Sequence, residues 1–467
     1  MDQVSAFFDT QDVPQDKVAD RLRGTIVGGA LGDAIGLYTE FLSKTLAHEV
    51  YPEAKFQLVE PATQFYADHH RLKFAPTGWT DDTDHALLIV LSYLHGNGDL
   101  DPVDFAGRLQ FWVEQGLRCL DRLPLGLGQT VGRVGIYATV AIQTLTIQVV
   151  CDKNFLNDPP ATAYDKWNRA KRNAAANGSL MRTAPLGIMC FGKTQEETFQ
   201  VATDYSLVTH VDPRCVISCC LATGLVRGIL RDEVATEQDV DALIEASLNW
   251  TEAWIAEQNS LSESTTDDRF PRIGRDEFRK HVSTQTLEEL ELDDAMKMGY
   301  VYKSLGAGIL LLRQSMRRLN SSNPEGLFEE LITNLIMQGG DADTNAAVAG
   351  SLLGALVGYQ GLPAQWKDGL MHGDWLLRKC DALGSVTKIQ PLSEPYNGKN
   401  DPDTGLEGGK LRLTLPELQQ REKEFSERWL TASAEAMEKR LQEKKKKLEE
   451  KKSNGPGGRL RRFLFGK

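Results

Sequence analysis

Apolar residues recur three and four positions apart over most of the chain between about residues 21 and 383. This spacing places them on one face of an α-helix, and clear examples are residues 86–94, 216–230, 305–319 and 327–337. We find no convincing run of alternating apolar and polar residues, bounded by turn residues, that indicates a β-strand. The pattern therefore predicts an all-α body.

Changes in composition divide the chain into four segments. Residues 1–18 are polar and are expected to form a loose lead-in, and residues 19–384 carry the helical patterns of one domain. Residues 385–416 are rich in Pro, Gly, Asn and Asp and predict a linker. Residues 417–467 predict a charged helical tail with a basic and aromatic end, which acts as a solvated end, a dimerisation arm or a docking element. Within the domain, residues 152–164 and 259–275 predict surface loops.

The charge along the chain is uneven. The formal net charge of the 467 residues is −12, but residues 419–467 hold 15 Lys or Arg and 8 Asp or Glu, so the remainder carries −19. A body this acidic disfavours nucleic acid as a partner and suits a protein that concentrates cations. Seven Cys without a C-x-x-C pair, and no visible secretory signal, predict reduced thiols in an intracellular compartment, cytoplasmic or nuclear.

Glycine recurs every four residues in two segments, namely Gly24, Gly28, Gly32 and Gly36, and then Gly350, Gly354 and Gly358. On a helix these residues share one face. Each interior Gly costs about 1 kcal/mol relative to Ala, so we expect close helix–helix packing to offset that cost. A membrane-spanning helix is the alternative for residues 346–362. Polar residues lie close to both ends of that stretch, which favours a buried helix and no membrane partner.

Two acidic motifs each precede a predicted helix, and they are Thr80-Asp81-Asp82-Thr83 and Asp341-Ala342-Asp343-Thr344. Side chains two residues apart on a helix point about 200° apart. The Asp pairs therefore converge only where the chain turns before the helix, and the preceding Gly339–Gly340 pair permits such a turn. Capping of the two helices is the alternative for either motif alone, because Thr and Asp are good N-cap residues.

Taken together, the two motifs predict a metal site. Four clustered carboxylates would repel one another without cations, and two divalent ions would neutralise them. The motifs contain hard oxygen ligands and no Cys, and the neighbouring His85 is expected to pack in the helix that follows. This donor set favours two Mg²⁺ ions, or Mn²⁺, over Zn²⁺.

Five ordered segments carry a resemblance to a known family. They are Gly29–Gly36 with Glu40 after it, Thr80–Thr83, Asn177–Gly187, Thr209–Pro213 and Gly339–Ala347. In this order they resemble the ADP-ribosylglycohydrolase family, over about residues 21–383. The resemblance implies an all-α fold, a compact orthogonal bundle of many helices with a dinuclear Mg²⁺ site in a cleft.

Matched position by position, the resemblance also implies roles for individual residues. Glu40, Asp81 and Asp343 are the catalytic candidates. The metal ligands implied are Thr80, Asp81, Asp82, Asp341, Asp343 and Thr344. The substrate-binding residues implied are Gly126, Gly128, Gln129, Asn177, Gly178, Ser179 and His210.

Structural readings of several residues stay open. Gly126 and Gly128 are alternatively a helix connector, and Arg182 and His210 are alternatively satisfied structural residues. Asp33 either braces the first helix or binds metal. The sequence assigns no role to the acid Asp84 that follows the first motif.

The resemblance implies hydrolysis of the bond between C1 of the distal ribose of ADP-ribose and an acceptor, with release of ADP-ribose. The acceptor is a protein Arg or Ser, or another O- or N-linked group, so the expected partner is an ADP-ribosylated protein or a small conjugate. The alternatives are a catalytically silent ADP-ribose-binding or crystallin-like structural protein, and a metal-dependent phosphoesterase.

Overall fold

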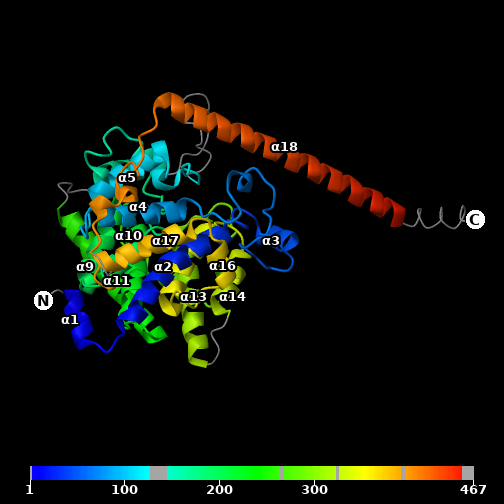
Figure 1. Cartoon of the computed structure of the whole chain (residues 1–467). Coiled ribbons are helices and arrows are strands. Elements are labelled where there is room, and N and C mark those ends of the chain that lie inside the picture. The colour runs from blue at the N-terminus through cyan, green and yellow to red at the C-terminus, as the bar shows by residue number, and fades with distance from the viewer. Residues whose placement is uncertain (1–2, 127–144, 262–267, 322–325, 391–394, 455–467) are drawn as a thin grey trace, which may run out of the picture.

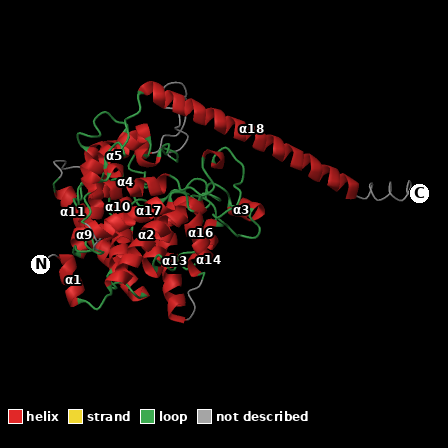
Figure 2. Ribbon diagram, in the orientation of Figure 1, coloured by secondary structure: helices red, strands yellow, loops and turns green. Residues whose placement is uncertain are grey.

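The computed structural model describes residues 3–126, 145–261, 268–321, 326–390 and 395–454. These residues form helices and no strand, which confirms the predicted all-α class (Figures 1 and 2). The first nine helices are α1 (Gln3–Thr10), α2 (Gln15–Gly36), α3 (Lys44–Val50), α4 (Asp81–His95), α5 (Pro102–Gln115), α6 (Leu145–Val150), α7 (Pro159–Arg169), α8 (Ala184–Met189) and α9 (Gln195–Leu207). The remaining helices are α10 (Pro213–Leu230), α11 (Glu237–Ser260), α12 (Arg275–Val282), α13 (Val301–Ser321), α14 (Leu327–Ile336), α15 (Ala342–Val357), α16 (Ala364–Gly369), α17 (Gly373–Val386) and α18 (Leu415–Asn454).

Helices α2 and α15 pack along their glycine faces in the middle of the body. A Cβ placed on Gly28 would lie 2.4 Å from the carbonyl oxygen of Gly350, and one on Gly354 would lie 1.9 Å from that of Gly24. A Cβ on Gly32 would lie 1.9 Å from the carbonyl oxygen of Ala346. The two backbones therefore touch, as the glycine stripes predict, and any side chain on these faces would push the helices apart.

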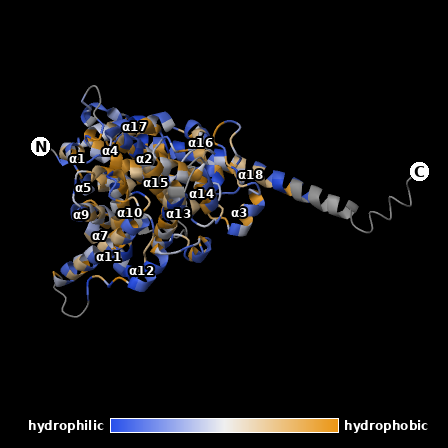
Figure 3. Cartoon of the chain, turned by 90° about the horizontal axis from the view of Figure 1, so that it is seen from below, coloured by the Kyte–Doolittle hydropathy of each residue, from blue (hydrophilic) through white to orange (hydrophobic). Residues whose placement is uncertain are grey.

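The rest of the body surrounds this pair with apolar helices. Hydrophobic residues concentrate around α2, α4 and α15 in Figure 3. Helix α10 is long and apolar enough to cross a membrane by length and composition, but 94% of it is buried within the fold, as is common for a core helix. The expected buried environment of α15 is also observed, because nearly all of its residues are inaccessible.

Two of the segments predicted to lack regular structure contain helices. Residues 1–18 include α1, whose Phe7 ring lies 4.9 Å from that of Phe191 between centroids. Residues 152–164, predicted as a loop, include the start of α7. The Asp158 side chain caps this helix by accepting from Ala161 N–H, and Pro159 occupies the first turn, where its missing N–H costs nothing. The Pro pair therefore begins a helix, which corrects the loop prediction.

Part of the predicted linker, residues 385–416, packs on the body. Lys379 of α17 pairs with Asp401 at 2.6 Å and Asp403 at 2.9 Å, and Trp375 Nε1 donates to Asp403 at 2.8 Å. Thr404 is fully buried. The segment after α17 therefore returns across the body before α18 begins. Residues 262–267, within the second predicted surface loop, lie outside the described residues.

Candidate metal centre

The candidate centre begins where α2 ends. Gly36 packs so closely on α15 that a Cβ placed on it would lie 2.4 Å from the Cα of Asp343. Four residues later, Glu40 is 5% exposed. The N–H of Phe41 donates to the carbonyl of Gly340 at 2.6 Å, and the N–H of Gly340 donates to the carbonyl of Leu42 at 2.9 Å. Glycine packing and two hydrogen bonds therefore bring Glu40 to the turn that starts α15.

The turn before α15 depends on its two glycines. Gly339 and Gly340 both have a φ of +71°, which side chains disfavour, and a Cβ on Gly340 would lie 1.9 Å from the carbonyl oxygen of Leu292. The turn ends at Asp341, which occupies the N-cap position without a side-chain capping hydrogen bond. The Asp341 carboxylate instead accepts from Asn177 Nδ2 at 2.8 Å. Asp341 is therefore directed to the cluster and does not serve the helix.

The start of α4 is capped and meets the start of α15. Thr80 Oγ1 accepts from the Asp82 N–H and donates to Asp343 Oδ2 at 3.2 Å. Asp33 of α2 accepts from Thr80 N–H at 2.9 Å and from Thr83 N–H at 3.0 Å. Capping thus explains Thr80 in part, but its bond to Asp343 also joins the two motifs. Asp33 therefore braces the start of α4, and not the first helix as the sequence indicated, and metal binding by Asp33 stays a prediction.

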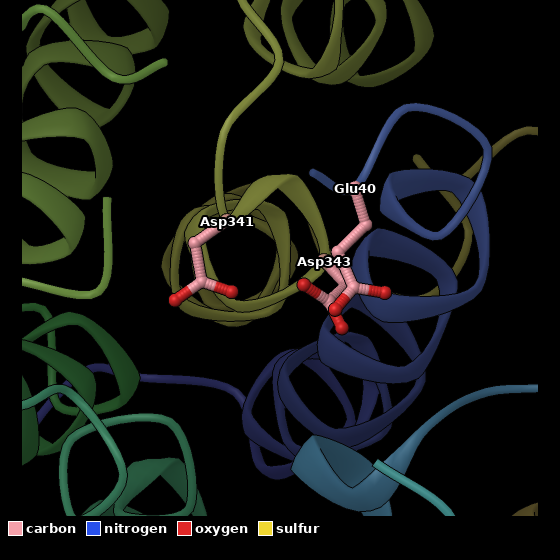
Figure 4. Close-up of side chains that lie close together, drawn as sticks. All are labelled: Glu40, Asp341 and Asp343. Atoms are coloured by element: carbon pink, nitrogen blue, oxygen red, sulfur yellow. The ribbon is translucent and has the colours of Figure 1, made fainter. Parts of the chain in front are cut away.

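Three carboxylates converge on one point. An oxygen atom from each of Glu40, Asp341 and Asp343 lies within 4.8 Å of the other two. In Figure 4, Glu40 comes from the segment after α2, whereas both Asp residues come from the start of α15. The structure therefore brings Glu40, expected as a catalytic residue, into contact with residues expected as metal ligands.

The acidic cluster consists of the Asp residues of the two motifs together with Glu40. Burial and mutual repulsion raise the pKa values of these Asp residues. Desolvation is the main cause for Asp343, whose pKa lies well above its usual value, and the charges of Glu40 and Asp82 add to it. The pKa values of Asp81 and Asp82 are raised well above the usual value in the same way, and that of Asp341 is also raised. Without a cation, the cluster therefore tends to retain protons.

The donor atoms of the cluster fit a divalent cation. Asp82 Oδ1 and Asp343 Oδ1 are buried and have no hydrogen-bond partner among the described residues. Burying a carboxylate oxygen without a partner is costly, and a hard cation would satisfy both atoms. The three converging groups offer only carboxylate oxygen, which suits Mg²⁺ or Mn²⁺ better than Zn²⁺.

The segment expected to bind substrate at Gly126–Gln129 reaches the first acidic motif at Gly126. A Cβ on this residue would lie 1.7 Å from Asp81 Oδ1, and its φ of +113° also requires Gly. Gly128 and Gln129, expected in the same loop, lie outside the described residues. The part of the loop that is described therefore lies directly against the first acidic motif.

The other expected substrate residues lie in the segments near α8 and α9. Asn177 is 7% exposed and contacts the cluster through Asp341, whereas Ser179 is fully buried and accepts from Ser206 Oγ at 3.1 Å. His210 is 1% exposed, and its Nδ1 lies 2.8 Å from Thr209 Oγ1. Contact of these residues and of Gly178 with substrate stays a prediction.

His210 and Arg182 lie in a buried polar group. Burial lowers the pKa of His210 to about 3, and the nearby Arg182 adds to this effect, so the imidazole is neutral. Arg182 donates to Thr209 Oγ1 at 2.8 Å and to the Tyr205 carbonyl at 3.2 Å. These contacts agree with a structural role for Arg182, but its Nε and Nη1 have no hydrogen-bond partner among the described residues, so the residue is only partly satisfied.

Another acid beside the cluster has structural partners that the sequence did not indicate. Asp84, which had no assigned role, accepts from Trp79 Nε1 at 2.7 Å, Trp112 Nε1 at 3.1 Å and Arg122 Nε at 3.0 Å. These bonds hold the first turn of α4 against its neighbours. Three donors far apart in the sequence form this arrangement, so no local motif predicts it.

His70 is the neighbour of the cluster that sequence reasoning missed. Its Nε2 lies 2.5 Å from Glu40 Oε2. The residue is in the irregular stretch between α3 and α4, next to the 3₁₀ turn η1 (Arg71–Lys73). The local sequence has neither a helical period nor a recognised motif, so only the tertiary contact identifies it.

Comparison with known proteins places this arrangement in a family. The family model described as ADP-ribosylglycohydrolase matches residues 14–391. The chain is similar to the ADP-ribosylarginine hydrolase Tri1 of Serratia proteamaculans (strain 568), with 24% identity over 79% of this chain and 81% of that protein. It is also similar to the ADP-ribosylhydrolase ARH3 of Bos taurus, with 24% identity over 74% of this chain and 87% of that protein.

A solved structure supports the fold independently. The structure described as an ADP-ribosylglycohydrolase-related protein complex matches with a TM-score of 0.50 and 21% identity, covering 80% of this chain and 99% of its own. Because the family model covers most of the chain and the named relatives are hydrolases, the chain belongs to the ADP-ribosylglycohydrolase family and is a glycosidic-bond hydrolase.

Proposed function

We propose that the chain is a Mg²⁺-dependent hydrolase that cleaves the bond between C1 of the distal ribose of ADP-ribose and an acceptor group. The observation that carries the metal requirement is the pair of buried, unpartnered oxygens, Asp82 Oδ1 and Asp343 Oδ1, on two helix starts that touch each other. The diphosphate of ADP-ribose needs positive charge nearby. The acidic protein does not supply it, but bound Mg²⁺ ions would.

The residues that would hold two ions are Thr80, Asp81, Asp82, Asp341, Asp343 and Thr344. When bound, the ions orient the ribose hydroxyls and offset negative charge. Hydrolysis at C1 also needs a group that removes a proton from the attacking water. Glu40 meets this need, because its carboxylate reaches the cluster from a separate segment and its Oε2 is held by His70.

Gly126 and Asn177 position the substrate in this proposal. The missing side chain of Gly126 lets the backbone of this loop lie directly against Asp81, so its N–H groups would border the metal site, where a phosphate could accept from them. Asn177 holds Asp341 in place by a hydrogen bond. Gly299 lies on the same side of the cluster, because a Cβ placed on Gly299 would be 3.4 Å from Asp341 Oδ2. Arginine is the acceptor to test first, because the relative Tri1 is named an ADP-ribosylarginine hydrolase.

The proposal is tested by release of ADP-ribose from ADP-ribosyl-arginine and ADP-ribosyl-serine in Mg²⁺. Asp343→Asn and Asp81→Asn should lose the activity by at least about 10³-fold, because each removes a charged oxygen from the cluster. Asp374→Asn is the matched control, since Asp374 is an exposed acid in the first turn of α17.

Wild-type rates that survive EDTA, or that survive in Asp343→Asn, would contradict the metal requirement. Binding of ADP-ribose without turnover of any conjugate would identify a silent binding protein. Cleavage of a phosphodiester in place of the ribosyl bond would identify a phosphoesterase, and either result would overturn the proposed reaction.

A further inference from the structure

Glu40 has a neighbour that neither acidic motif explains. Its Oε2 lies 2.5 Å from His70 Nε2, and the two side chains are only 7% and 23% exposed. The His70 ring is packed by two aromatic rings, with centroid distances of 4.9 Å to Phe41 and 5.4 Å to Phe74. The imidazole therefore has little freedom, and its bond to Glu40 fixes where that carboxylate points.

The next residue holds the backbone of Glu40. Arg71 is fully buried, and its guanidinium donates to the carbonyl of Glu40 and, at 2.9 Å, to the carbonyl of Tyr38. A third bond pairs the guanidinium with Asp68. A guanidinium presents its donors in a rigid fork, so the Arg71 side chain can hold the backbone around Glu40 and the segment that contains Asp68 in one arrangement. His70 and Arg71 thus act on the side chain and main chain of the same residue.

The C-terminal helix α18 packs on this short segment. Trp429 Nε1 donates to the carbonyl of His69 at 2.9 Å, and Lys73 Nζ lies 5.5 Å from the centre of the Trp429 ring. Further along the helix, the Arg440 guanidinium lies 4.2 Å from the centre of the Tyr66 ring. The contacts therefore span nearly the whole segment 66–74.

One face of α18 makes these contacts. Phe425 and Ser433 are each 9% exposed and lie four residues before and after Trp429, so the three share a face of the helix. By contrast, the adjacent Leu430 is 58% exposed. Figure 1 shows that the C-terminal end of the helix projects away from the body. Helix α18 therefore docks through the contacts made between Phe425 and Arg440, and its end extends beyond them.

We propose that residues 66–74 are a positioning element, which α18 holds through Trp429 and which in turn holds the Glu40 carboxylate through His70. The role of Glu40 in this inference rests on the proposed hydrolysis. The connection from α18 to Glu40 does not, because it follows from contacts within the chain. His70 is a positioning residue here, since it acts on substrate only through Glu40.

The effect of His70 is tested by two substitutions in the full-length protein. His70→Ala should lower kcat for ADP-ribosyl-arginine by about 10- to 100-fold, with KM changed by no more than about 3-fold, as is usual when the partner of a site carboxylate is lost. His70→Gln should restore most of the activity, because its amide can donate to Glu40. Unchanged kcat in His70→Ala, or a Gln variant as defective as the Ala variant, would overturn the proposal.

The effect of α18 is tested without any need for activity. Hydrogen exchange followed by mass spectrometry should show faster exchange of peptides covering residues 66–74 and 38–43 in Trp429→Ala than in wild type. Leu430→Ala is the matched control and should leave both regions unchanged. Trp429→Phe, which keeps the ring and loses the N–H, should give an intermediate rate.

The two experiments separate the two claims. If the wild-type protein releases no ADP-ribose, the proposed function fails, and the exchange data still decide the connection between α18 and Glu40. If the protein is active but Trp429→Ala exchanges like wild type in residues 66–74, the positioning role of α18 is wrong.

Discussion

Helices α4 and α15 begin with similar acidic sequences, but the protein builds the two starts differently. At α4 the N-cap residue Thr80 accepts a bond from the helix, whereas at α15 the N-cap residue Asp341 makes no capping bond. The turn into α15 needs two glycines with positive φ, and no glycine of that kind immediately precedes α4. Because glycines fix the turn before α15, Asp341 does not have to cap the helix. Its carboxylate therefore stays available to a metal ion.

The surroundings of the two starts differ as well. Asp82 and Asp343 occupy the same helical position, and each has one unpartnered buried oxygen. Two residues later, α4 carries Asp84, which binds two Trp side chains and Arg122, whereas α15 carries Asn345, which accepts from Ser304 Oγ at 2.7 Å. The additional acid of α4, Asp84, is thus paired with the positively charged side chain of Arg122. The acids left without compensation are those that face the candidate metal site.

The largest effect is expected from the glycine that shapes the turn into α15. Gly340→Ala should destabilise the protein by about 3–5 kcal/mol, because the new Cβ would meet a backbone carbonyl in a positive-φ turn. Gly78→Ala before α4 should cost less than about 1 kcal/mol, because its nearest contact would be 3.5 Å away. Urea unfolding of the two variants measures the difference, and equal losses would contradict the contrast between the turns.

Some acids face the candidate metal site, and others have structural partners. Neutralising one acid of each kind should change the free energy of unfolding in opposite directions. In metal-free protein at pH 7.5, Asp343→Asn should raise the free energy of unfolding by about 1–2 kcal/mol, because folding no longer has to bury an acid whose charged form is disfavoured by burial and by the nearby carboxylates. Asp33→Asn should lower it by about 1–3 kcal/mol, because that carboxylate accepts bonds from Thr80 and Thr83.

Thermal melts of the same variants with and without Mg²⁺ provide the second measurement. Wild type should be stabilised by Mg²⁺, and Asp343→Asn should not respond to it. A destabilised metal-free Asp343→Asn protein would mean that Asp343 is a structural acid like Asp33.

The two helices should also differ in their response to acid. Burial lowers the pKa of His85 in α4 well below its usual value, and the charge of Arg182 adds to this, whereas α15 has Ala346 at the corresponding position. The unfolded chain protonates this imidazole near pH 6.5 and the folded protein does not. Stability is therefore lost as pH falls below about 6.5, by up to about 1.4 kcal/mol per pH unit.

This response is isolated by comparing wild type with His85→Leu in metal-free protein. Unfolding free energies measured between pH 6.5 and 5 should fall less steeply in the variant. The raised pKa values of the cluster acids act in the opposite direction, but they are common to both proteins. Parallel pH profiles would show that His85 is protonated in the fold.

The smallest effect is expected from the cap of α4. Thr80→Ala should lower stability by about 1 kcal/mol, because the helix loses its capping oxygen. Thr80→Ser should stay close to wild type, because the hydroxyl remains. Asp341→Asn should show no capping loss at all. Denaturation in the absence of metal distinguishes the three, and a loss in Asp341→Asn comparable to that in Thr80→Ala would contradict the assignment of the two caps.

Much of the fold was predictable because it depends on local periodicity. The helical stretches follow from apolar residues at i, i+3 and i+4, and the contact between α2 and α15 follows from glycines four residues apart. The predictions that failed were based on composition. The Pro pair at the start of α7 indicated a loop, but Pro also suits the first turn of a helix.

The sequence by itself determined the helical class, the turn at Gly339–Gly340 and the acids at two helix starts. Each of these is a property of a few neighbouring residues, and the sequence displays it directly. Only the tertiary structure decided which acids are left unpaired, because Asp33 and Asp84 differ from Asp82 and Asp343 in their partners and not in their chemistry. The contact of His70 with Glu40 likewise came from packing, since burial and distance join residues that no local pattern connects.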